Sequence, residues 1–419
     1  MKHRMQMIGL ALVAGVMPLS AVTLEELAAR MEALENKVAA YERRYGPLED
    51  GGPLPETMRG PAKVPELVPK GGMAGDVSDL DAAYGIGGSG TGDGGGSSWA
   101  DRTTLGGYGE MHLNLGDEEM IDFHRWVLFV NHKFNDRIKL FSELELEHSL
   151  AGDGKPGEVE LEQAYIEFDL GRNVFAKAGL FLLPVGLLNE VHEPDTFYGT
   201  ERNPVEKEII PTTWWEGGVG LTQAADNGFQ WDLAVHSGLN VPVTGSNAYR
   251  IRSGRGKVAE APAMAPAVTG RLRYSGLPGL DVSVFGQYQD DITQDGGDED
   301  NSAVFVGASA TYQRGGFGLR GLIGHWDIDG PTPAMLGRDS QTGYFIEPSY
   351  SWMLGQNSRV GLFTRYNRYE YAKGEVEQID AGLNFWPVDN VVLKADYSHI
   401  DQDGSSTEDV FNLGVGYSF

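Results

Sequence analysis

Histidines and carboxylates are the residues here that could do chemistry, but their spacing matches no catalytic or metal motif. His192 precedes Glu193, yet no second histidine follows four residues later, as helical zinc motifs require. No nucleophile elbow, phosphate-binding loop or dinucleotide fingerprint lies in a strand-turn-helix setting. We therefore predict no enzyme, no cofactor and no metal site. An embedded hydrolase would need a histidine beside a serine, and the candidates by type alone are His112, His236, His325 and His399.

A second group of charged residues recurs at every other position of apolar-polar runs. Alternate positions share one face of a strand. If the apolar face meets lipid, the charged face lines a wet interior and biases the passage of ions. The acids come early and the arginines late, so closure could place them on opposite walls and set a field between them. The predicted lining residues are Glu143, Glu167, Lys177, Glu216, Arg271, Arg273, Arg320, Glu347 and Arg365.

One long link, 184–213, carries further candidates. It contains Glu193, Arg202, Glu206 and Lys207 among several Phe, Tyr, Ile and Pro residues. Links of this length are usually functional or disordered. The apolar residues and paired charges favour an ordered segment, so we expect these four side chains to be held at a constriction.

The elements that would position these residues are strands. From residue 105 the chain repeats about ten residues of period-2 alternation followed by a turn, as in 411–419. Short and longer links alternate between them, which is typical of outer-membrane barrels. We predict an all-β, 16-stranded antiparallel transmembrane β-barrel over 103–419. The strands should begin near 105, 120, 138, 159, 173, 215, 228, 267, 280, 302, 317, 341, 358, 376, 391 and 409.

The first hundred residues differ in character from the rest. Basic, apolar and small residues over 1–21 form a secretory signal pattern. Heptad spacing over 22–45 predicts a short α-helical coiled coil, although a lone amphipathic helix on a surface has the same pattern. The Pro- and Gly-rich stretch 46–102 predicts a disordered linker.

The bulk composition fits an exported protein and a barrel whose interior is lined by polar residues. The 419 residues include no cysteine and 58 glycines, and mean hydropathy is negative. The formal charge of −27 argues against nucleic acid as a partner, since phosphate binding needs a basic face.

The stretches 182–189, 192–194, 201–203 and 210–218 resemble the phosphate-selective porin O and P type family of outer-membrane porins. The resemblance covers roughly 105–419. It implies a bacterial outer-membrane porin that forms a homotrimer and whose third outer loop, here 184–213, folds inward and narrows the channel. Phe419, at the end of an amphipathic strand, resembles the signal that such barrels present to the barrel-assembly machinery.

These observations predict passive diffusion of small hydrophilic solutes and ions through a barrel that contacts outer-membrane lipid and lipopolysaccharide. Two alternatives stay open. One is an anion-selective channel for phosphate, and the other is a structural or adhesive barrel whose interior is plugged.

Overall fold

The computed structural model describes residues 99–116, 119–296 and 301–419. The predicted signal at 1–21, the heptad segment at 22–45 and all of the predicted linker before residue 99 lie outside the described residues. Within the described part, no helix is long and apolar enough to cross a bilayer.

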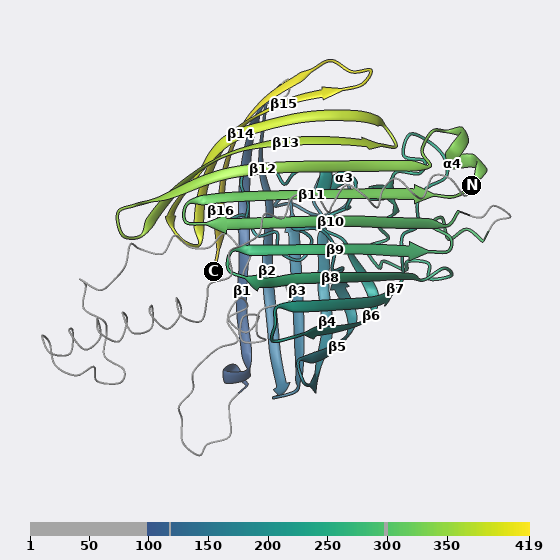
Figure 1. Ribbon diagram of the computed structural model, residues 1–419, viewed down its shortest axis with the longest axis horizontal. Coiled ribbons are helices and arrows are strands. Elements are labelled where there is room, and N and C mark those ends of the chain that lie inside the picture. Colours follow the sequence, from purple (N-terminus) through teal and green to yellow (C-terminus); the bar gives the residue numbers. More distant parts are fainter. Residues whose placement is uncertain (1–98, 117–118, 297–300) are drawn as a thin grey trace, which may run out of the picture. The chain divides into compact units, whose positions relative to one another are not determined.

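Sixteen strands make up most of the described residues (Figure 1). Each begins within two residues of its predicted start, because alternation and turn residues mark strand ends directly in the sequence. In chain order they are β1 (Thr103–Leu115), β2 (Glu119–Asn135), β3 (Ile138–Glu147), β4 (Val159–Gly171), β5 (Val174–Leu182), β6 (Trp215–Ala224), β7 (Phe229–His236), β8 (Ala267–Leu277), β9 (Leu280–Gln289), β10 (Ala303–Arg314), β11 (Phe317–Ile328), β12 (Ser340–Leu354), β13 (Ser358–Tyr371), β14 (Gly374–Val388), β15 (Val391–Gln402) and β16 (Glu408–Ser418).

The strands form a closed antiparallel barrel. Each pairs with the next along the chain, and β16 returns to β1 with Tyr108 opposite Ser418. Beyond β16, Phe419 and Gly107 exchange two backbone hydrogen bonds of 2.9 Å. Closure leaves no open sheet edge, which a barrel needs in lipid. The predicted all-β, 16-stranded fold is confirmed.

The two faces of the wall differ as the alternation predicts. In β7 every second residue is exposed, and the exposed set includes Trp231 and Leu233, while Gln230 and Asp232 are buried inside. Apolar side chains therefore point outward and polar ones inward. This is the arrangement of a barrel whose outer surface faces hydrocarbon.

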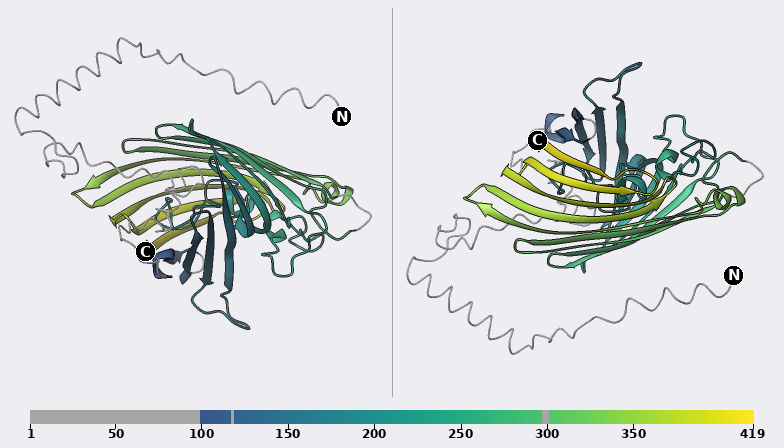
Figure 2. Two further views of the ribbon diagram at one scale, coloured as in Figure 1. Left: turned by 90° about the horizontal axis from the view of Figure 1, so that it is seen from below. Right: turned by 90° about the horizontal axis from the view of Figure 1, so that it is seen from above.

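The links differ in length at the two ends of the barrel. Short turns lie at the end where the chain terminates, and the longer links lie at the other (Figure 1). Short helices occur in three longer links: α3 (Val205–Glu208), η3 (Ile251–Gly254) and α4 (Pro331–Met335). The views in Figure 2 show the strands curving around the segment that holds α3.

Candidate functional site: the inner loop and the barrel wall

The link between β5 and β6, residues 183–214, is called the inner loop here. Its two ends are joined by a backbone hydrogen bond of 3.1 Å from Leu183 to Trp214. Asn189 completes this neck, because its amide donates to the carbonyls of Leu183 and Trp214 at 2.8 and 2.9 Å. Its Oδ1 accepts from the Trp214 amide at 2.7 Å. The link is thus an ordered, closed loop, as its composition predicts.

Glu206 holds the middle of the inner loop together. Its fully buried carboxylate accepts hydrogen bonds from the backbone amides of Leu187 and Leu188 at 2.5 and 2.8 Å. Its other oxygen accepts from the Asn203 side chain at 2.9 Å. Burial raises the pKa of Glu206, although the backbone donors act in the opposite direction. The sequence predicts Glu206 at a constriction, and in the structure its carboxylate binds the backbone of the inner loop.

One face of the inner loop is apolar and packs on the wall. Val205, Ile209 and Ile210 belong to one buried cluster with Phe305 and Trp326. The indole of Trp326 also donates a 2.8 Å hydrogen bond to the Ile209 carbonyl. These aromatic residues lie in the inward phase of β10 and β11, so the inner wall is apolar where the loop covers it.

Glycines on the wall make room for this contact. A Cβ on Gly343 would lie 2.8 Å from Ile209 and 3.1 Å from Val205, and one on Gly324 would lie 3.2 Å from Ile209. Further along, a Cβ on Gly414 would lie 3.0 Å from Thr200. Some of the glycines of the wall are therefore positions where the inner loop approaches the strands too closely for a larger residue.

Polar side chains of β11 and β13–β15 bind the loop backbone over residues 195–200. Each donates to a carbonyl or accepts from an amide of this stretch. The pairs are Trp386 to Asp195 at 3.2 Å, Arg320 to Thr196 at 2.9 Å, Asn384 to Phe197 at 3.0 Å, Arg365 to Tyr198 at 3.3 Å, Lys394 to Gly199 at 2.7 Å, and the Thr200 amide to Asp396 at 2.7 Å.

Three of the wall arginines that the sequence places inside, Arg271, Arg273 and Arg365, have carboxylate partners. Arg271 contacts Asp232 at 2.9 Å and Glu190 of the inner loop at 2.5 Å. Arg365 contacts Asp380 at 2.9 Å and Glu347 at 3.2 Å. Arg273 is paired with Asp281. The positive charge on this side of the ring is therefore largely balanced by acids.

The opposite wall, β1–β4, is rich in acids. Glu110, Glu143, Glu145 and Glu162 are all buried there. Arg125 contacts Glu110 at 2.5 Å and Glu145 at 3.8 Å. His192 of the inner loop lies 3.5 Å from Glu162 and 3.8 Å from Glu143. The expected separation of early acids from late arginines is incomplete, because Arg125 lies among the early acids and late acids lie beside Arg271 and Arg365.

The remaining predicted residues occupy varied positions. Lys177, opposite Glu167 across β4 and β5, lies 4.4 Å from the Phe181 ring centroid. Glu216 accepts from the Trp214 indole at 2.9 Å, and Arg202 donates to Thr213 at 2.8 Å. Lys207 is exposed. Burial, with a smaller contribution from Asp195, raises the pKa of Glu193 to about 7.

A second loop, residues 237–266, covers the inner loop and is called the capping loop. Its Arg250 pairs with Glu208 at 2.7 Å, and its Arg252 donates to the Thr212 carbonyl at 2.8 Å. Arg255 donates to the Thr213 carbonyl at 2.5 Å. Sequence reasoning missed these contacts; three arginines within six residues of one link were the available signal.

A cleft remains beside the inner loop. It is lined by Glu190 and Val191 from the loop and by Arg271, Arg273 and Asp281 from the wall. Charged groups of both signs thus face the space next to the loop.

Comparisons with known proteins show which solved structures have a similar fold. No family model matches the chain. An uncharacterized protein of Aquifex aeolicus is 26% identical over 349 residues, which cover 75% of this chain and 80% of that protein. The anion-selective porin from Comamonas acidovorans has a TM-score of 0.55 at 12% identity, covering 76% of this chain and 99% of its own.

Two further solved structures are similar. Salmonella typhi OmpF, in complex with daunomycin, has a TM-score of 0.52 at 14% identity and covers 76% of this chain and 97% of its own. The trimer form of OmpT, an outer membrane protein of Vibrio cholerae, has a TM-score of 0.50 at 11% identity and covers 76% and 99%. These likenesses show that the chain has the porin fold.

Proposed function

We propose that this chain forms a bacterial outer-membrane channel through which small hydrophilic solutes and ions diffuse passively, and that the inner loop narrows the passage. One observation carries this proposal: a closed ring with an apolar outer face has charged residues inside, and the inner loop is bound to its wall. Such a ring suits lipid outside and water inside. The fold likeness to porins supports the same function.

The charges support a preference for cations. Arg271 and Arg365 each contact two carboxylates, so they offer little free positive charge to a passing anion. On the facing wall lie four buried glutamates, and two of them, Glu110 and Glu145, contact one arginine, Arg125. Charged side chains that line a pore set its selectivity. The alternative, an anion channel for phosphate, rests on the resemblance of 182–218 to phosphate-selective porins.

Planar-bilayer recording of the purified full-length protein tests both points. In a KCl gradient, the sign of the reversal potential distinguishes cation from anion preference. We expect stable conductance steps and a cation-selective potential. An anion-selective potential that inorganic phosphate shifts further would replace this proposal with the phosphate channel.

A structural or adhesive barrel is the second candidate function. The specific observation in its favour is the capping loop, because Leu239, Val241 and Ile251 share a buried apolar cluster with the inner loop inside the ring. Two loops packed in this way could close the interior. Absence of conductance from correctly folded protein would favour this candidate.

We also propose the organisation expected of such a protein. Residues 1–21 direct export, 22–45 form a coiled coil that assists a homotrimer, and 46–102 tether it to the barrel. The outer face contacts lipid and lipopolysaccharide, and the β16 strand ending in Phe419 engages the barrel-assembly machinery. Deletion of 22–45 should weaken the trimer on unheated gels while leaving the barrel folded.

A further inference from the structure

Three histidines from separate elements gather at one end of the barrel interior. His112 belongs to β1, His124 to β2, and His148 follows the end of β3. The rings of His112 and His124 are stacked with centroids 4.7 Å apart, and those of His124 and His148 lie 5.8 Å apart. They lie toward the end of the barrel with the longer links, because β1 and β3 run toward that end.

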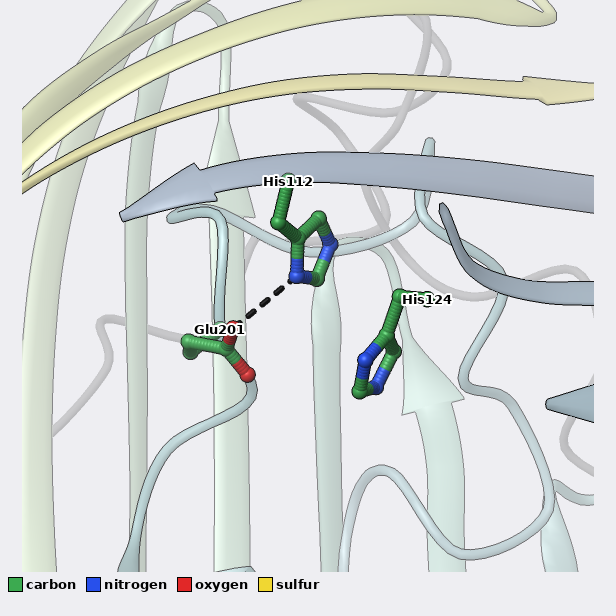
Figure 3. Close-up of side chains that lie close together, drawn as sticks. All are labelled: His112, His124 and Glu201. Carbon is green, nitrogen blue, oxygen red and sulfur yellow. Dashed lines mark hydrogen bonds and ion pairs between the residues drawn. The ribbon is translucent and has the colours of Figure 1, made fainter. Parts of the chain in front are cut away.

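Carboxylates complete two ligand sets that share His124. Glu201 of the inner loop lies 2.9 Å from Nδ1 of His112, on the side where His124 also points (Figure 3). Asp122 lies 2.8 Å from Nδ1 of His148 and 3.3 Å from Nδ1 of His124. Within each set, His112–His124–Glu201 and Asp122–His124–His148, one ligand atom per residue lies within 4.8 Å of the others.

Glu110 and Arg125 hold the ring of His112 in place behind the first set. Nε2 of His112 lies 3.2 Å from Glu110, and Glu110 in turn accepts a 2.5 Å hydrogen bond from Arg125. When the Nε2–H group of His112 donates to Glu110, Nδ1 carries no proton. Its lone pair, on the side that faces Glu201, is then free to bind a metal ion. Carboxylate–histidine–metal triads use this arrangement, in which the outer carboxylate fixes the tautomer and orientation of the ligating ring.

The ligand types narrow the choice of ion. Mixed imidazole and carboxylate donors suit borderline divalent transition metals such as Zn²⁺, Cu²⁺ and Ni²⁺, whereas Ca²⁺ and Mg²⁺ prefer oxygen donors alone. Asp122, His124 and His148 are each partly exposed, so an ion has access to the cluster from solvent.

We propose that His112, His124 and Glu201, with Asp122 and His148 beside them, bind a divalent transition-metal cation at the mouth of the barrel. Glu201 belongs to the inner loop and both histidines of its set belong to the wall, so the ion links the loop to β1 and β2. Metal binding by itself does not depend on the proposed channel function; only an effect of the metal on conductance does.

Cu²⁺ and Zn²⁺ binding by the full-length protein in detergent tests this proposal. Electron paramagnetic resonance of bound Cu²⁺ should show hyperfine coupling to imidazole nitrogen, and competition with a chromophoric chelator should give the Zn²⁺ affinity. Loss of an outer-shell partner alone weakens metal binding about 10- to 100-fold. H124A removes a ligand from both sets, so it should weaken Zn²⁺ binding at least tenfold on the same scale.

His399→Ala is the matched control, since His399 pairs with Asp409 at 2.7 Å but belongs to no three-residue ligand set among the described residues. If H124A does not assemble, H148A and E201Q provide the test from outside the strands. Lack of nitrogen coupling in wild-type protein, or equal Zn²⁺ affinity in H399A and the cluster variants, would overturn the proposal.

Conductance provides a separate measurement. Zn²⁺ added on the outer side should change the single-channel current of wild-type protein and leave that of H124A unchanged. Metal binding without any conductance would retain the metal site and reject the channel, whereas conductance without metal binding would do the reverse.

Discussion

Replacement of Glu206 by alanine should release the inner loop from the wall. The substitution removes the acceptor of the Leu187 and Leu188 amides, which are within 2.5 and 2.8 Å of the carboxylate. A buried donor that loses its partner costs about 1–3 kcal/mol, so two such amides cost about 2–6 kcal/mol. Removing a carboxyl group whose pKa is raised by burial offsets part of this, which favours the lower end.

This free energy concerns the docked state of the loop and not the strand ladder. A loss of about 2 kcal/mol increases the undocked population roughly 30-fold. Hydrogen exchange of the full-length protein should therefore show faster exchange at Leu187 and Leu188, with β9–β11 unchanged. Single-channel conductance should rise or become noisy, because the loop no longer stays against the wall.

Two variants sharpen the experiment. Glu206→Gln keeps one oxygen that can accept from both amides, so its effect should be smaller. Glu208→Ala removes a neighbouring buried acid that pairs with Arg250 of the capping loop and does not bind the inner-loop amides. If exchange at Leu187 and Leu188 in E206A equals that in wild type or in E208A, the assigned role of Glu206 is refuted.

Three other perturbations have defined outcomes. Because burial raises the pKa of Glu193 to about 7, the stability that its protonated form gives the docked loop is complete below about pH 4.5 and declines as pH rises to 7. Cation preference from reversal potentials should increase around pH 7, where the carboxyl group in the docked loop ionises, and E193Q should flatten part of that rise. Gly343→Ala places a Cβ 2.8 Å from Ile209 and should destabilise docking by about 1–3 kcal/mol, measured as protease cleavage of the inner loop, whereas Gly270→Ala, where the nearest atom lies at 3.7 Å, should not. Arg271→Gln leaves the acids beside it without their cation, so the potassium-to-chloride permeability ratio should rise, and an unchanged ratio would show that the cleft does not control selectivity.

The barrel was predictable because its information is local. Alternation assigns each residue to a face, and turns mark where strands end, as β7 illustrates with exposed Trp231 beside buried Asp232. The interior was harder to predict, since alternation does not say what lies across the ring. Arg320 and Arg365 are expected from the sequence to face the interior, but the carbonyls of Thr196 and Tyr198 that they bind are more than 120 residues away in sequence.

The inner aromatic residues were missed for a related reason. Assigning apolar side chains to lipid leaves no place for Phe305 and Trp326, which point inward because the inner loop covers them. The histidine cluster has no local signature in the sequence, because metal motifs that can be recognised in a sequence place their ligands close together. His112 and Glu201 are 89 residues apart, and only the barrel register and the folded loop bring them together.

The hydrogen bonds between Phe419 and Gly107 make the carboxyl-terminal residue part of the barrel seam. Each strand from β2 to β15 pairs with the strands directly before and after it in sequence. The second edge of β1, by contrast, is paired only by β16, the last strand. Until β16 pairs with it, the free edge of β1 exposes unpaired backbone groups. Such an edge can form hydrogen bonds with a strand of another copy of the chain unless it is shielded. Without β16 the sheet would stay open at β1, so the ladder between Tyr108–Leu115 and Phe411–Ser418 is the contact that closes the barrel.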